Sequence, residues 1–110
     1  MRMSSAMAAA DRNVFVQLAP GSKTQAVVEI SSLDPKGNAL GKLLHRERED
    51  LYRRTATPVS FKYTQSTAVV MGKLGELHPG AVVHVNGTVG VDHKIAAEPI
   101  VILTGYLKVI

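Results

Sequence analysis

Basic side chains are concentrated in one stretch of this sequence and are the first candidates for chemistry. Five Lys and Arg residues lie between residues 39 and 54, and two further candidates follow them. Such side chains neutralise the phosphates of a polyanion. The alternative is an ordinary solvated surface, because Glu47, Glu49 and Asp50 are interleaved with the cations. The seven candidate phosphate contacts are Lys42, Arg46, Arg48, Arg53, Arg54, Lys62 and Lys73.

Aromatic rings are the second candidate feature, because nucleobases stack on them at roughly 1–3 kcal/mol per base. The chain has two Phe, three Tyr and no Trp. We take Phe15, Tyr52 and Tyr63 as candidate stacking residues. Phe61 and Tyr63 share one strand face, where Phe61 is expected in the core and Tyr63 fits core or ligand equally well. Phe15 fits either an exposed sheet face or a second buried one.

Residue patterns that would indicate catalysis or metal binding are missing from the sequence. The four His residues lack HxH or HxxxH spacing, and there is no Cys to complete a zinc site. Neither a phosphate-binding glycine loop nor a Ser-His-Asp arrangement occurs. His84 alternates with Val83 and Val85, so it is expected on the outer face of a strand. We therefore expect neither an enzyme, a cofactor nor a metal site.

The composition is that of one soluble domain. The chain has 110 residues, of which 45% are hydrophobic and 20% charged, with a net charge of +4. No apolar run approaches the ~20 residues of a membrane span, and a cytoplasmic location is the simplest fit. The positive charge is compatible with a polyanionic partner without requiring one. We expect residues 1–12 to form a flexible leader and residues 13–110 a single domain.

Alternating apolar residues and dense turn signals predict a small β-barrel. The expected strands are residues 13–18, 25–32, 58–71, 81–90 and 94–104, with breaks at residues 34–38 and 91–93. Residues 74–78 are too short for an independent helix and are expected to form one capping turn. Asn86-Gly87 is expected as a bulge, and Pro99 at an edge or bulge, since proline cannot donate a ladder hydrogen bond.

Residues 39–54 have a different pattern, which favours a short exposed amphipathic helix. Apolar side chains recur at offsets of 3, 4, 7 and 8 residues, as on one face of a helix. Glu49 precedes Arg53, and Asp50 precedes Arg54, by the four residues that support a helix. A long excursion between strands with helical tendency is the alternative.

The stretch from Thr67 to Leu103 resembles the second half of the bacterial single-stranded DNA-binding protein family. Three motifs carry the resemblance: the connector Gly72-Lys73-Leu74 with nearby Glu76, an alternating strand opened by Gly80, and a final strand. The matching strand residues are Val83, Val85, Gly87, Ile95, Ala97, Ile100 and Leu103. About a third of the chain is covered, and the matching residues determine the fold more than the ligand. The family stacks bases on several aromatic residues, often Trp, which this chain lacks.

The resemblance implies an all-β fold with one short helix, arranged as a five-stranded Greek-key barrel of the OB-fold type. It implies binding of single-stranded nucleic acid with little sequence preference, DNA being favoured over RNA. A homodimer or tetramer is expected, because linked weak sites gain from effective concentration. The alternative is a structural or adaptor OB-fold that docks another protein without contacting nucleic acid. A barrel that binds a small molecule at its mouth is a third and more distant possibility.

Overall fold

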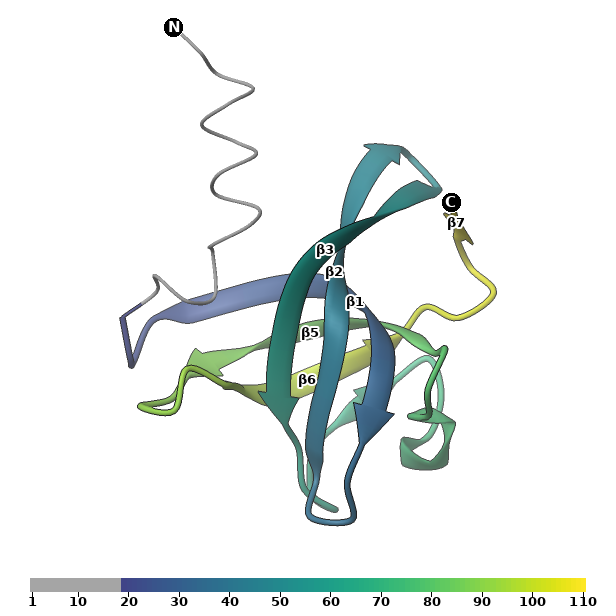
Figure 1. Cartoon of the computed structure of the whole chain (residues 1–110). Coiled ribbons are helices and arrows are strands. Elements are labelled where there is room, and N and C mark those ends of the chain that lie inside the picture. Colours follow the sequence, from purple (N-terminus) through teal and green to yellow (C-terminus); the bar gives the residue numbers. More distant parts are fainter. Residues whose placement is uncertain (1–18) are drawn as a thin grey trace, which may run out of the picture.

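The computed structural model describes residues 19–110, which form seven β-strands and one short 3-10 helix (Figure 1). The expected leader over residues 1–12, the expected strand over residues 13–18 and Phe15 lie outside the described residues. In chain order the elements are β1 (Lys23–Leu33), β2 (Asn38–Arg48), β3 (Leu51–Lys62), β4 (Val69–Val70), η1 (Leu74–Glu76), β5 (Val82–Val89), β6 (Ile95–Ile102) and β7 (Lys108–Val109).

The strands make one sheet that curls back onto itself. Its order is β4-β6-β5-β1-β2-β3-β7, with an additional pairing between β6 and β3. That pairing is parallel and joins Phe61 to Ile95 and Lys62 to Ala96. The five long strands therefore form a closed circuit, and the arrangement is barrel-like (Figure 1). The prediction of a nearly all-β domain is confirmed for residues 19–110, although these contain seven strands rather than five.

The core follows from alternation along the long strands. Val28, Val59, Phe61, Val83 and Val85 are fully buried, and their chain neighbours are more exposed, although Val82 beside Val83 is also buried. Ile95, Ile100 and Ile102 on β6 complete the interior. The expectation that Phe61 belongs to the core is thus confirmed.

The predicted helix over residues 39–54 is wrong, because this stretch forms most of β2 and the start of β3. β2 pairs with β1 on one side and β3 on the other, from Asn38–Lys62 to Arg48–Leu51. Gly41, near the start of this stretch, disfavours a helix by roughly 1 kcal/mol relative to Ala. The offsets of the Leu residues mimic a helical stripe, but two-sided strand pairing buries more of the chain than an exposed helix would.

An irregularity in the β2–β3 pairing lies within the stretch whose Leu residues have helical spacing. Between the pairs Lys42–Pro58 and Leu44–Arg54, the single residue Leu43 faces three residues of β3. The hydroxyl of Thr55 donates to the carbonyl of Leu43 at 2.6 Å and accepts from the N–H of Thr57 at 3.2 Å. This bulge separates the barrel from the part of the hairpin at residues 44–54, which we call the hairpin arm and which projects beyond the barrel in Figure 1.

The remaining predicted elements are partly confirmed. The strand over residues 25–32 lies within β1, and those over residues 81–90 and 94–104 contain β5 and β6. The strand predicted over residues 58–71 is instead divided, since β3 ends at Lys62 and β4 has only two residues. The capping turn is present as η1.

The irregularity predicted at Asn86-Gly87 is present, but the extra residue belongs to the other strand. Between the pairs Val85–Ile100 and Gly87–Ala97, Asn86 alone opposes Glu98 and Pro99. Pro99, which follows a cis peptide bond, therefore lies at a bulge as predicted. Among residues 19–110, none of the helical segments has the length and apolar character needed to cross a bilayer.

Candidate nucleic-acid interface

The outer surface of the paired strands β2 and β3 is built by the same alternation that builds the core. Ala39, Gly41, Val59 and Phe61 point inward and are buried. Their neighbours consequently point outward, in the cross-strand pairs Asn38–Lys62, Leu40–Ser60 and Lys42–Pro58. We call these six outward side chains the β2–β3 face.

The hairpin arm continues this face, and the predicted phosphate contacts within residues 44–54 lie on both of its sides. Arg46 pairs with Tyr52, and His45 pairs with Arg53, so these two pairs lie on opposite faces of the arm. The guanidinium of Arg54 reaches Glu29, which is the β1 partner of Lys42. The side that carries Arg46, Tyr52 and Arg54 is therefore continuous with the β2–β3 face, and Arg53 lies on the other side.

Three of the seven predicted cations form ion pairs within residues 19–110. Arg54 holds Glu29 through two hydrogen bonds of 2.8 and 3.1 Å, and Arg53 bonds Glu47. Lys62 contacts Asp92 at 2.8 Å. The hydrogen bond from Arg53 lowers the pKa of Glu47, the bond from Lys62 lowers that of Asp92, and Glu29 raises the pKa of Arg54. Their charges are thus already partly compensated.

The other four predicted cations have no carboxylate partner among the described residues. Lys42, Arg46, Arg48 and Lys73 are all exposed. Arg46 donates only to the backbone carbonyl of Arg48, at 3.4 Å. Lys73 lies apart from the arm, at the start of η1, where its N–H donates to the carboxylate of Glu76. Lys42 and Arg46 are consequently two uncompensated cations that share a face with Tyr52.

The loop between β5 and β6 borders the β2–β3 face, and this contact was not predicted from the sequence. Its Asp92 holds Lys62, and Lys94 donates through its ammonium to the side-chain oxygen of Asn38 at 3.3 Å. These contacts join positions 30 and 56 residues apart. Nothing in the local sequence pattern indicates such pairings, because they depend on the return of β6 to β3.

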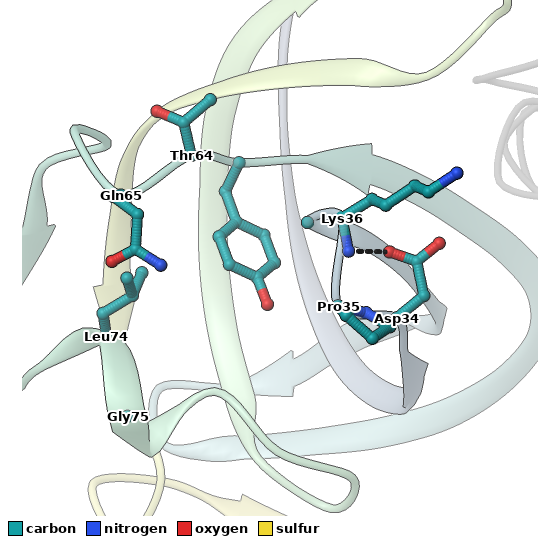
Figure 2. Close-up of a pocket in the computed structure, with 9 residues that line it drawn as sticks. Asp34, Pro35, Lys36, Thr64, Gln65, Leu74 and Gly75 are labelled. Carbon is teal, nitrogen blue, oxygen red and sulfur yellow. Dashed lines mark hydrogen bonds between the residues drawn. The ribbon is translucent and has the colours of Figure 1, made fainter.

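A cavity of about 670 Å³ lies at the end of β2 and β3 opposite the arm. Residues 34–37, 63–65 and 74–75 line it. In Figure 2 the turn with Asp34, Pro35 and Lys36 forms one side, and Thr64, Gln65 and Leu74 form the other. Tyr63 is a candidate from the sequence, but the cavity has no local signal there, because three segments separated along the chain line it.

The turn that forms one side of the cavity has the residues its geometry requires. The N–H of Gly37 donates to the carbonyl of Asp34 at 3.2 Å, with proline at the second position as this kind of turn prefers. Gly37 has φ 87°, and a Cβ there would overlap the carbonyl oxygen of Tyr63. The Asp34 carboxylate accepts three hydrogen bonds, two from Asn38 and one from the N–H of Lys36, and those from Asn38 chiefly lower its pKa.

Tyr63 connects the cavity to the core. The residue is half-buried, and its ring centroid lies 6.4 Å from that of Phe61. Its N–H donates to the carbonyl of Gly37 at 2.9 Å, which fixes the backbone beside the turn. Tyr63 thus packs against the core and also lines a cavity, while its role as a stacking residue stays a prediction.

His84 lies on the outer face of β5, as its alternation with valines predicts, but it is only partly exposed. Its Nε2 lies 3.0 Å from the side-chain oxygen of Gln25, and its Nδ1 lies 3.4 Å from the amide nitrogen of Asn86. Partial burial lowers its pKa. Within residues 19–110, no group of three His, Cys, Asp or Glu side chains is arranged to hold a metal ion.

The chain was compared with protein-family models, with curated proteins and with solved structures, and none of the three comparisons gives a match. The resemblance to single-stranded DNA-binding proteins therefore stays a prediction, and the chain's own geometry carries the functional argument.

Proposed function

We propose that this protein is an OB-fold that binds single-stranded nucleic acid across the β2–β3 face and the hairpin arm. The pairing order supports the fold: β1, β2 and β3 form a meander, β5 lies beside β1, and β6 pairs with both β5 and β3. In this proposal those five strands make up the Greek-key barrel, and the two-residue strands β4 and β7 are additions to it. OB-folds bind oligonucleotides on the face of their second and third strands.

The observation that carries the proposal is the alignment of Lys42, Arg46 and Tyr52 on one side of β2 and β3. Single-strand binding combines cations that follow the backbone with rings on which bases stack. From the Asn38–Lys62 pair to the Arg46–Tyr52 pair, β2 advances eight residues, or roughly 26 Å at 3.3 Å per residue. A strip of that length offers a single strand several contacts in succession.

The ion pairs along the strip are compatible with this role. Exposed ion pairs contribute little to folding stability, so a phosphate can compete for Arg54 or Lys62 without dismantling the barrel. Lys42 and Arg46 need no such exchange, because no described carboxylate pairs with them. We therefore expect these two cations to contribute most to the salt dependence of binding.

Fluorescence anisotropy with labelled oligo-dT and oligo-rU tests the proposal across a series of salt concentrations. The double variant Lys42→Glu/Arg46→Glu should weaken binding and flatten the slope of log K against log salt by about 1.4, at ~0.7 per lost contact to a single strand. Lys23→Glu is the matched control, because Lys23 is equally exposed but lies at the far end of β1. An unchanged slope in the double variant would contradict the proposed face.

An adaptor that docks another protein is the second candidate, and exposed apolar side chains favour it. Val91 is 88% exposed in the loop beside the β2–β3 face, and Leu40 on that face is 43% exposed. If wild-type protein binds oligonucleotides no more tightly than an unrelated protein of equal pI, the adaptor becomes the better proposal. Light scattering on the same samples would measure the expected dimer or tetramer.

A further inference from the structure

The cavity between residues 34–37 and residues 63–75 contains polar groups that the fold itself does not use. Within residues 19–110, neither the Tyr63 hydroxyl nor the Gln65 amide nor the Lys36 ammonium forms a hydrogen bond or ion pair. Asp34 differs, because its carboxylate is occupied by the N–H groups of its own turn. An aromatic ring, an amide that both donates and accepts, and a cation are thus available around one hollow.

The walls of this cavity are held in place without a ligand. Tyr63 and Gly37 are joined by a backbone hydrogen bond, and the N–H of Thr64 donates to the hydroxyl of Thr67 at 2.8 Å. The segment that contributes Leu74 and Gly75 is held by two reciprocal bonds, from the N–H of Lys73 to the carboxylate of Glu76 and from the N–H of Glu76 to the carbonyl of Lys73. A site that is already ordered loses little conformational freedom on binding, which favours affinity.

The lining suits one planar polar ring, and the volume is large enough to hold it together with part of its nucleotide. About 670 Å³ lies within the usual range of small-molecule pockets, roughly 300–1,000 Å³. Leu74 supplies an apolar contact, and Gly75 presents backbone without a side chain. The Gln65 amide lies on the same side as Leu74 (Figure 2). An aromatic contact together with an amide suits a nucleobase, which has a π face and an edge of donors and acceptors.

The cavity is also continuous with the proposed strand-binding face. A smaller cavity of about 240 Å³ lies on the β2–β3 face between Leu40, Ser60 and Lys94, and Asp34 lines both cavities. The backbone bond between Tyr63 and Gly37 directly follows the last pair of the face, Asn38–Lys62. A strand that lies along the face would therefore reach the cavity at one end.

We propose that the cavity accepts the base of one unpaired nucleotide at the end of the bound strand. Tyr63 contacts the ring of the base, the Gln65 amide hydrogen-bonds its edge, and Lys36 contacts the adjoining phosphate. This assignment rests on the proposed function and deepens it. It also gives binding a direction along the strand, because the hollow at the arm end of the strip, which residues 48–51 and Lys108 line, has no aromatic ring.

The test uses the shortest oligonucleotide that retains full affinity, prepared intact and with an abasic nucleotide at either end. With wild-type protein, removal of the base at one end should weaken binding about 5- to 150-fold, and removal at the other end much less. In Tyr63→Leu and Gln65→Ala the abasic penalty should shrink, because the group that contacts the base is gone. Tyr106→Leu is the control, since Tyr106 is 61% exposed and does not line the cavity.

Lys36→Gln should leave the abasic penalty in place and lower the salt slope by about 0.7. If Tyr63→Leu destabilises the fold, Gln65→Ala and Lys36→Gln still decide the question, because both side chains are exposed. Equal affinity for intact and abasic strands in wild-type protein would overturn the cavity assignment while leaving strand binding intact. Failure of the wild-type protein to bind any oligonucleotide would instead remove the proposed function itself.

Discussion

Four glycines in this chain allow the backbone of the β1–β2 turn to be tested with controls from the same molecule. Gly37 has φ 87° and also lies so close to Tyr63 that a Cβ would overlap the Tyr63 carbonyl oxygen. Gly21 has φ 92° with open space around it. Gly87 would meet the carbonyl oxygen of Ala96 at an ordinary φ, and Gly75 has neither constraint.

The expected losses of unfolding free energy follow from these differences. Gly75→Ala should be neutral or stabilise by up to about 1 kcal/mol, because alanine restricts the unfolded chain. Gly21→Ala should cost about 1–2 kcal/mol for the left-handed conformation alone. Gly37→Ala also displaces Tyr63 and breaks its hydrogen bond to Gly37, which is worth about 0.5–1.5 kcal/mol, so a total loss of about 1.5–3.5 kcal/mol is expected.

Urea denaturation of Gly75→Ala, Gly21→Ala and Gly37→Ala measures these three losses directly, and Gly87→Ala shows the cost of a backbone overlap without a positive φ. In thermal melts each kcal/mol should appear as about 4–8 °C for a domain of this size. Gly37→Ala should lose clearly more free energy of unfolding than Gly21→Ala, because only Gly37 lies against Tyr63. Equal losses in the two variants would show that the approach of Tyr63 to the turn does not constrain the fold, and the preformed cavity would lose its main support.

Other predictions concern the core, the bulge and pH. Phe61→Ala should lower the free energy of unfolding, measured in urea, by about 3–5 kcal/mol, because the ring is fully buried. Ser60 is the outward neighbour of Phe61, and Ser60→Ala should change the free energy of unfolding by no more than about 0.5 kcal/mol. Thr55→Val should cost about 1–2 kcal/mol, since the hydroxyl both donates and accepts in the bulge, and a loss below measurement error would count against that role. The lowered pKa of His84 means that the unfolded chain binds its proton more readily, so stability should fall as pH decreases below about 6.5. His84→Gln should remove part of this decrease, and identical pH profiles for both proteins would contradict it.

Much of the sheet was predictable because its signals are local. Alternation in β1, β5 and β6 and the Asp-Pro-Lys-Gly-Asn turn specify their own conformations within a few residues. Residues 39–54 carry a helical spacing of Leu residues, and only pairing with two neighbouring strands overrides it. β7 could not be predicted, because a two-residue strand is defined by its partner and not by its own residues. β4 lies inside the strand predicted over residues 58–71, but its separation from β3 and its pairing with β6 depend on the fold.

The candidate site was foreseen by residue type but not by arrangement. The sequence predicted Lys42, Arg46, Tyr52 and Tyr63 as contacts, and the structure places the first three on one side of β2 and β3. It could not show that Arg54 is held by Glu29, which lies 25 residues earlier in the chain. The cavity residues Lys36 and Gln65 occupy ordinary turn sequences, and only the fold brings them together.

The parallel seam between β3 and β6 has a consequence for the order of events during synthesis. The seam joins residues more than thirty positions apart through only two residue pairs, so the nascent chain cannot close its circuit until β6 has left the ribosome. Until then β3 and β5 each keep an unpaired edge, and such edges recruit other chains. Translation arrested before Ile95 should therefore leave a fragment that aggregates. During normal synthesis, the time between the completion of β5 and the arrival of β6 is the interval in which a chaperone would be needed.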